Sequence, residues 1–133
     1  MNGKFVLQSA SKAEELDWGS LRWICGPALT GARDVVVCEV LIQPGKGHNF
    51  HRHPRQEEVI YVVDGQMEQW LDGMKKILGP GDSVFIPRGT VHASFTVGSR
   101  PLRAMAILGP CVGEGGYELV DVSGEAPWST LRT

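Results

Sequence analysis

The sequence lacks the features that mark membrane-spanning and nucleic-acid-binding proteins. None of its apolar runs approaches the ~20 residues of a membrane-spanning helix. Its 13 lysines and arginines are scattered along the chain, and 15 acidic residues leave a formal net charge of −2. A nucleic-acid-binding domain usually carries a basic patch or stripe, which is missing from this sequence. We therefore expect the protein to bind neither a membrane nor a nucleic acid.

Cysteine is scarce, and its positions form no recognisable pattern. Cys25, Cys38 and Cys111 are an odd number, lie far apart and include no Cys-x-x-Cys pair, which argues against a disulfide framework. The chain begins MNGKFVLQSASKAEELDWG, which lacks the basic-then-apolar order of a signal peptide. We expect a cytoplasmic protein whose cysteines are reduced and pack as small core or near-surface residues.

Glycine, in contrast, is abundant and divides the chain into short segments. The 17 glycines and 8 prolines are spread out and separate runs rich in β-branched and aromatic residues. From residue 35 these runs are VVVCEVLI, EEVIYVV, QMEQWL, SVFI, HASFTV and LRAMAIL. The pairs Asp64-Gly65 and Asp72-Gly73 are typical of hairpin turns. Short strands at regular spacing, with no long helical period, predict an all-β sandwich or barrel.

Two of the predicted strands are apolar on both faces. VVVCEVLI is the clearer example and LRAMAIL is nearly another, whereas a strand of a one-core sandwich alternates between apolar and polar residues. Such strands need a second covering surface, so we expect either a homodimer or a terminal segment folded over one sheet. The length fits a single domain over 1–133, with an N-terminal covering segment (1–34), a barrel core (35–110) and a C-terminal segment (111–133).

Three of the four histidines lie close together in the stretch HNFHRHPRQEEVIYVVDG. His51 and His53 are two residues apart, and in an extended strand such residues point to the same face. Their imidazoles can reach one point, to which Glu58 and His92 can add ligands from neighbouring strands. Three imidazoles and one carboxylate suit a first-row divalent metal, zinc included, and leave a coordination position open. We interpret His48 as a surface turn residue after PGKG rather than as a ligand.

Two stretches of the sequence resemble the two motifs of the cupin superfamily. The first motif is a glycine, five residues, His-x-His, three or four residues, Glu, six residues and Gly, and it matches Gly45 to Gly65. The second is a glycine, five residues, Pro-x-Gly, two residues, His, three residues and Asn, and it matches GDSVFIPRGTVHASFT from Gly81. The last position differs, because Thr96 replaces the family asparagine.

This resemblance implies a fold, a ligand set and a cofactor. Cupins are double-stranded β-helix, or jelly-roll, barrels. The metal ligands of the family correspond here to His51, His53, Glu58 and His92. They imply one divalent transition metal, which is Fe, Mn, Ni, Zn or Cu. The family asparagine is not usually a ligand, so the change at Thr96 affects the hydrogen bonds around the site and leaves the ligand set complete.

Strand alternation predicts which neighbours of the ligands face the same side. Glu57 and Glu58 are adjacent and face opposite ways, so we expect Glu57 in solvent or paired with a neighbour such as Arg55. The residues in phase with the ligands are expected to line a substrate pocket, and they are Asn49, Ile60, Val62, Ser94 and Thr96. Such a pocket suits a small oxygenated molecule, but the sequence identifies no catalytic residue.

Three functions are compatible with such a site. The first is a metal-dependent isomerase, epimerase or lyase that acts on a sugar or a carboxylated acid, with the metal as a Lewis acid. The second is a dioxygenase of the quercetin dioxygenase type. The third is a sensor or binding module that holds a small ligand without converting it. Enzyme activity is the favoured interpretation, although the fold alone does not choose among reactions.

Overall fold

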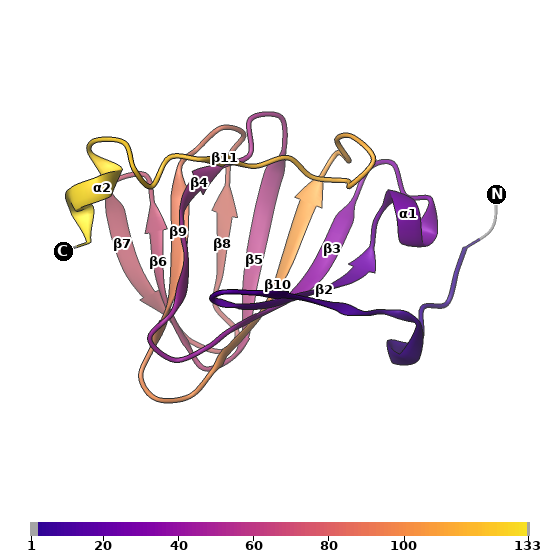
Figure 1. Ribbon diagram of the computed structural model, residues 1–133, viewed down its shortest axis with the longest axis horizontal. Coiled ribbons are helices and arrows are strands. Elements are labelled where there is room, and N and C mark those ends of the chain that lie inside the picture. Colours follow the sequence, from indigo (N-terminus) through magenta and orange to yellow (C-terminus); the bar gives the residue numbers. More distant parts are fainter. Residues whose placement is uncertain (1–2, 133) are drawn as a thin grey trace.

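Two antiparallel β-sheets face each other in the computed structural model of the chain, which describes residues 3–132 (Figure 1). The six-stranded sheet has the order β1 (Ala13–Leu16), β2 (Gly19–Cys25), β3 (Val36–Ile42), β10 (Leu102–Gly109), β5 (Glu57–Asp64) and β8 (Ser83–Ile86). The five-stranded sheet has the order β11 (Val120–Asp121), β4 (Gly47–Arg52), β9 (His92–Val97), β6 (Gln66–Leu71) and β7 (Met74–Leu78). This arrangement confirms the predicted all-β jelly roll.

The two ends of the chain add to different sheets. β1 pairs with β2 and β2 with β3, so residues 13–25 lengthen the six-stranded sheet. β11 pairs with β4, and the short helix α2 (Trp128–Leu131) packs on the five-stranded sheet (Figure 1). Single helical turns at η1 (Gln8–Ala10) and α1 (Pro27–Thr30) complete the regular structure. No helix in residues 3–132 has the length and apolar character needed to cross a membrane.

The two Asp-Gly pairs have different roles. Asp72-Gly73 closes the predicted hairpin, because β6 and β7 pair on either side of it. The hairpin predicted at Asp64-Gly65 is wrong, because β5 and β6 belong to different sheets and the chain passes from one to the other there. Gly65 has a φ of 86°, and a Cβ atom on it would lie 2.7 Å from the carbonyl oxygen of Pro101. Glycine is needed at this crossing because it tolerates both the dihedral angle and the close approach.

The main core fills the space between the sheets, where residues such as Ile42, Met67 and Leu102 meet. A second cluster lies on the outer face of the five-stranded sheet, where Phe50 and its neighbours pack beneath α2. A terminal segment therefore covers one sheet, as one of the two sequence-based alternatives predicts. The outer faces of β3 and β10, whose sequences suggested the cover, keep exposed apolar residues such as Ile107.

Candidate metal centre

Four buried residues from three neighbouring elements meet inside the barrel. His51 lies in β4 and is paired across the sheet with His92, which opens β9. His53 follows β4 directly, and Glu58 comes from β5 in the opposite sheet. Their exposed fractions are 4%, 1%, 4% and 6%, respectively. A buried carboxylate beside three buried imidazoles is costly unless these groups are paired or bind a metal.

The three histidines hold their rings in the same way. In each ring Nδ1 lies beside a backbone carbonyl oxygen, at 2.6 Å for His51 and Asn49, 2.7 Å for His53 and Glu118, and 2.9 Å for His92 and Thr90. A carbonyl oxygen can only accept, so in the neutral ring Nδ1 carries the proton and Nε2 presents its lone pair. Metal-binding histidines are commonly oriented by such outer hydrogen bonds. The backbone thus sets these rings in the form that a metal ligand requires.

The Nε2 atoms and the carboxylate converge on one place. The candidate ligand atoms of the three histidines all lie within 4.8 Å of one another, so the three rings could hold a metal ion. Glu58 stands beside this group, with Oε1 at 3.3 Å from His53 Nε2 and 3.0 Å from His92 Nε2. Among the described residues, Glu58 Oε1 and His92 Nε2 are buried atoms with no hydrogen-bond partner. Two acceptors this close repel each other unless a proton or a metal cation lies between them, so a divalent metal fits the arrangement.

The charges at the site also favour a bound cation. Burial raises the pKa of Glu58, but the neighbouring imidazoles of His53 and His92 outweigh burial and lower the pKa to about 2. Burial lowers the pKa of His53, and its contact with Glu58 more than reverses this effect. Burial, helped by the neighbouring His48, holds the pKa of His51 well below its usual value, so this ring is neutral. An ionised carboxylate beside neutral imidazole is a donor set that divalent transition metals take.

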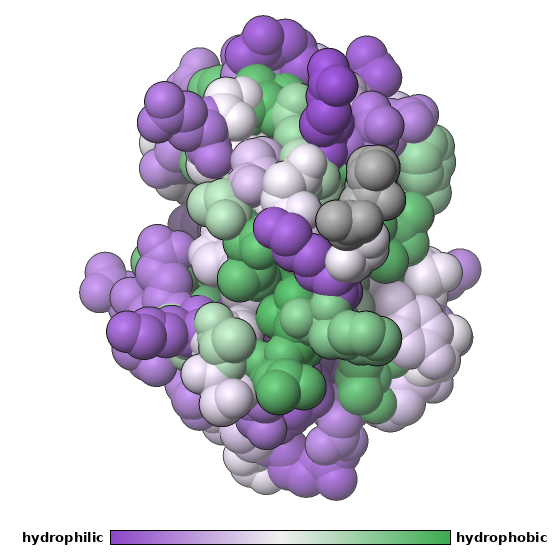
Figure 2. Space-filling model, turned by 90° about the vertical axis from the view of Figure 1, so that its right-hand side faces the viewer, coloured by the Kyte–Doolittle hydropathy of each residue, from purple (hydrophilic) through white to green (hydrophobic). Residues whose placement is uncertain are grey.

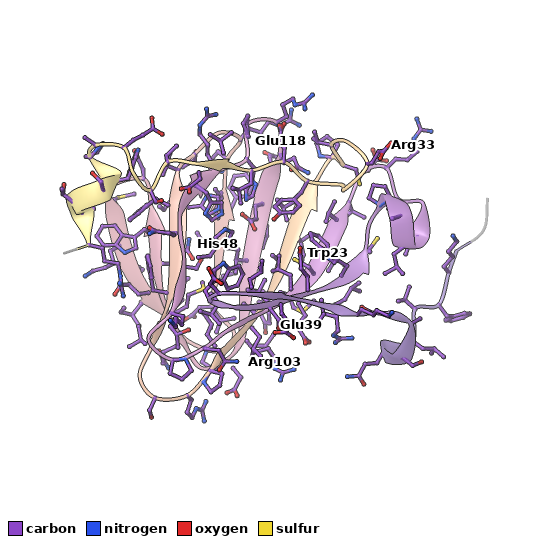
Figure 3. The ribbon with its side chains drawn as sticks, in the orientation of Figure 1. Trp23, Arg33, Glu39, His48, Arg103 and Glu118 are labelled. Atoms are coloured by element: carbon purple, nitrogen blue, oxygen red, sulfur yellow. The ribbon has the colours of Figure 1, made fainter. Side chains whose placement is uncertain are left out.

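His48 is not the surface turn residue that the sequence predicts. It belongs to β4 and is half-buried, and its ring stacks on Trp18 and on His51 with centroid distances of 4.9 and 3.8 Å. Figure 3 shows His48 in the space between the two sheets. Burial is the largest reason that its pKa falls to about 4. His48 therefore supports a candidate ligand, although it lies outside the three-histidine group.

An irregularity in β4 explains this placement. Between the pairs His48–Ser94 and His51–His92, β4 has two residues where β9 has one. This β-bulge reverses the alternation, so His48 turns inward. The alternation argument that placed Asn49 inside the barrel is wrong for the same reason. Asn49 is exposed, its side-chain oxygen accepts a hydrogen bond of 2.8 Å from the next backbone N–H, and it lines a hollow beside Trp18 instead.

A narrow cavity of about 50 Å³ leads from the candidate metal centre into the space between the sheets. His51, His53 and Glu58 form its polar side. Much of the remaining wall is aliphatic and includes Leu21, Val40, Ile42, Leu102, Ala104 and Leu108. The cavity therefore joins a set of metal-binding groups to a largely apolar wall.

The residues expected to line the pocket separate into two groups. Ile60 and Ser94 line this cavity, as strand alternation predicts. Val62 and Thr96 are buried on the same sides of their strands but lie beyond the cavity wall. The Thr96 hydroxyl donates a hydrogen bond of 3.0 Å to the carbonyl oxygen of Ile42, which ties β9 to the end of β3. The threonine that departs from the cupin motif thus has a structural partner of its own.

Two aromatic residues of the cavity wall were not predicted as site residues. The ring of Tyr117 packs on Trp23 and on His53, with centroid distances of 5.4 and 5.7 Å. Burial is the largest cause that raises the pKa of Tyr117. Tyr117 belongs to a segment, residues 110–118, that we call the C-terminal strap. Trp23 also lines the cavity, and Figure 3 shows Glu118 of the strap above it.

The buried side chain of Gln56 ties the strap to the loop between β4 and β5. Its Nε2 donates to the carbonyl oxygens of Pro110 and Gly116 at 2.7 and 3.0 Å. Its Oε1 accepts from the backbone N–H of Glu118 at 3.2 Å, and the carbonyl of Glu118 in turn holds His53. The strap therefore completes the site. Sequence reasoning missed it, because no motif links Gln56 to carbonyl groups at least 54 residues further along the chain.

The sequence predicts Glu57 either in solvent or paired with a neighbour such as Arg55, and the structure has the first arrangement. Arg55 makes two hydrogen bonds of 2.9 Å to the Glu118 carboxylate. Arg55 is therefore engaged by the strap rather than by Glu57. Glu57 is exposed, which agrees with the alternative that places it in solvent.

Comparisons with known proteins give a consistent result. Residues 38–108, which contain all four candidate ligands, match the family model described as the cupin domain. The polyketide synthase CurC of Streptomyces cyaneus is 32% identical over 109 residues, which span 82% of this chain and 70% of CurC. The dimethylsulfoniopropionate lyase DddQ of Ruegeria pomeroyi is 37% identical over 78 residues, which span 57% of this chain and 38% of the lyase.

Solved structures agree with the fold described above. The structure of KdgF from Halomonas sp. matches with a TM-score of 0.74 at 21% sequence identity, and the match covers 85% of this chain and 98% of KdgF. At this level of identity the likeness demonstrates a shared fold. It carries no information about the reaction, because one fold supports many chemistries.

Proposed function

Because the chain belongs to the cupin family, we propose that it is a metal-dependent enzyme acting on a small oxygenated molecule. The proposed site holds one divalent transition metal (Fe, Mn, Ni, Zn or Cu) on His51, His53, Glu58 and His92, and the substrate occupies the inner cavity. One observation carries the proposal: Glu58 Oε1 and His92 Nε2 lie 3.0 Å apart, buried and without a hydrogen-bond partner in residues 3–132. A metal cation accounts for both atoms at once.

The reaction class that we propose is isomerisation, epimerisation or elimination. A divalent metal at this site supplies a Lewis acid that polarises a substrate carbonyl or hydroxyl oxygen. The chain itself orients the ligands through backbone carbonyls and encloses the substrate in a small cavity. Tyr117 is the candidate proton-transfer group, because its phenol belongs to the cavity wall and its ring packs on His53. The sequence likeness to a lyase supports elimination within this class.

Metal content tests the proposal. Protein purified without added metal or chelator is analysed by inductively coupled plasma mass spectrometry beside the variants His51→Ala and Glu57→Gln. We expect near-stoichiometric metal in the unaltered protein and in Glu57→Gln, and its loss in His51→Ala. Zinc or manganese directs the search to anaerobic isomerase and lyase assays. No metal in any sample, even after reconstitution, contradicts the proposal and leaves a ligand-binding module.

A dioxygenase is the second candidate function. Imidazole and carboxylate ligands also suit iron, nickel and copper, and four protein ligands leave positions open on a six-coordinate metal. Iron, nickel or copper in the purified protein would therefore direct the search to oxygen-uptake assays with phenolic substrates. Ligand binding without product formation, under either set of assays, would favour the sensor module.

We also propose that two copies associate through the outer face of the six-stranded sheet. A row of apolar residues crosses the adjacent strands β8, β5, β10 and β3 there. Its members are cross-strand neighbours in the order Phe85, Val59, Ile107 and Val37. Phe85 is 53% exposed and Ile107 is 39% exposed. An exposed apolar row on paired strands forms a continuous surface. Two copies of the chain can bury such a surface against each other in a symmetric dimer.

Charged residues beside the row fit the same interpretation. Glu39 pairs with Arg22 and with Arg103 at 3.4 Å each, so acidic and basic groups share one patch, as a self-complementary interface requires (Figure 3). A second apolar area appears in Figure 2, on the side where α1 and the N-terminal segment lie. We favour the sheet face, because its side chains stand on paired strands, whereas Phe5 and Leu7 project from a segment with little regular structure.

A further inference from the structure

The wall of the inner cavity carries no lysine or arginine among the residues that the structure describes. The side away from the metal-binding groups is aliphatic. A ligand carboxylate that points along the aliphatic wall would be buried there without a counter-charge. Burial of an unpaired ion is strongly unfavourable, so the wall disfavours anionic groups.

The pKa of the Cys38 thiol also indicates that an anion is unfavourable at the cavity wall. Cys38 lies on the cavity, and burial is the largest cause that raises its pKa to about 12. Burial opposes the formation of any anion at this place. A carboxylate of a ligand on the same wall would meet the same condition.

Neutral polar partners on the wall are also few. The Ser94 hydroxyl donates its hydrogen to Gln69 Oε1 at 2.6 Å and is therefore engaged within the protein. Tyr117 supplies a hydroxyl group that has no hydrogen-bond partner in the described part of the chain. A sugar carries a hydroxyl group on nearly every carbon, and most of these groups would be left unpaired here.

We propose that the cavity selects small, uncharged ketones that offer two neighbouring oxygens to the metal and turn an aliphatic body toward the wall. A 1,3-diketone or a hydroxy ketone of a few carbon atoms has this chemistry, and the narrow cavity favours such small molecules. The inference rests on the proposed metal site and narrows its substrate class. It replaces the sugars and carboxylated acids that the motifs alone suggest with apolar-bodied ketones.

A pair of ligands with the same skeleton tests this inference. Pentane-2,4-dione and malonate both present two oxygens across one carbon, but malonate is a dianion at neutral pH. The zinc-loaded protein is titrated with each ligand by isothermal titration calorimetry, after its zinc content has been measured. We expect the diketone to bind at least about tenfold more tightly than malonate. Equal or tighter malonate binding, or no binding of the diketone, would overturn the inference.

A matched pair of variants separates the wall from the metal. Val40 is half-buried on the cavity wall, so Val40→Lys adds a cation there and Val40→Met adds similar length without charge. We expect malonate to bind Val40→Lys about tenfold more tightly than Val40→Met, which measures the steric effect of the longer side chain alone. Trp23→Arg serves the same purpose if Val40→Lys does not fold. An unchanged malonate affinity in the cationic variant argues against the inference alone, whereas a protein that takes up no zinc argues against the metal site itself.

Discussion

Glu57 and Glu58 are adjacent in the sequence, but their side chains lie in opposite environments. Glu57 and Glu58 have the same chemistry, but β5 turns Glu57 to solvent and buries Glu58 against His53 and His92. Alternation along a strand predicts this contrast without any tertiary information. The contrast also makes Glu57 a natural control for the buried residue.

Replacing Glu58 should weaken metal binding selectively. Glu58→Gln keeps the shape of the side chain but removes the negative charge beside the histidines, so we expect zinc affinity to fall at least about tenfold. Competition with a chromophoric chelator measures the affinity. Glu57→Gln is the control and should bind zinc as the unaltered protein does. Equal losses in the two variants would show that Glu58 is not a ligand.

The Cys38 thiol should be inert in the folded protein. Its pKa is raised from 9.0 to about 12, chiefly by burial, so it stays protonated at pH 9.0, where an ordinary cysteine is half ionised. We expect iodoacetamide to leave Cys38 unmodified until the protein is unfolded, which peptide mass spectrometry can show. All three cysteines, Cys25, Cys38 and Cys111, are free.

The same shift predicts a loss of stability at alkaline pH. The thiol ionises near its ordinary pKa of 9.0 in the unfolded chain but only near 12 in the folded one. Its contribution to the free energy of unfolding is therefore complete below the first value and disappears as the pH rises toward the second. Urea unfolding across this range should show a shallower decline for Cys38→Ala than for the unaltered protein. If the free energy of unfolding falls equally with pH in both proteins, the raised pKa of Cys38 does not cause the loss of stability.

At the scale of elements, the C-terminal strap and the bulge in β4 shape the site. The strap brings Tyr117 to the cavity and supplies the carbonyl that orients His53. The bulge turns His48 inward, against His51. Neither feature has a local signal, because a bulge depends on pairing with β9 and the strap depends on bonds to Gln56.

Gln56 should hold the strap in place. Gln56→Leu leaves two carbonyl oxygens and one backbone N–H without their partner, so we expect unfolding to become easier by about 1–3 kcal/mol. Hydrogen exchange should accelerate within 110–118, and zinc affinity should fall because His53 loses its orientation. Arg55→Gln removes only an exposed ion pair with Glu118 and should change exchange little. Similar hydrogen exchange in both variants would show that contacts other than those of Gln56 hold the strap in place.

At the scale of the whole molecule, the two outer sheet faces differ. α2 covers part of the five-stranded sheet, where Phe50 and Trp70 are buried beneath it. The six-stranded sheet instead leaves the row from Phe85 to Val37 on its surface. The sequence pattern of β3 and β10 requires a cover on this second face, which is the physical basis for expecting a dimer.

A charge placed in this row should dissociate the proposed dimer. Phe85→Asp introduces a carboxylate into the proposed apolar contact, so we expect sedimentation velocity at micromolar concentration to show monomers. Ile77→Asp is the control, because Ile77 is similarly exposed, at 50% against 53%, but lies on β7 of the other sheet. Dissociation by both variants, or by Ile77→Asp alone, would place the interface elsewhere.

The sequence by itself determined the fold class and, through its resemblance to the cupin motifs, the choice of Glu58 over Glu57 and the set of three histidines. These features depend on local spacing: residues two apart share a face of a strand, and the turn residues between strands are read directly from the chain. Only the tertiary structure decided that His48 faces inward, that Asp64-Gly65 joins two sheets, and that Tyr117 and Gln56 belong to the site. Each of these depends on which strands pair and on contacts between distant segments, and such contacts leave no periodic trace in the sequence.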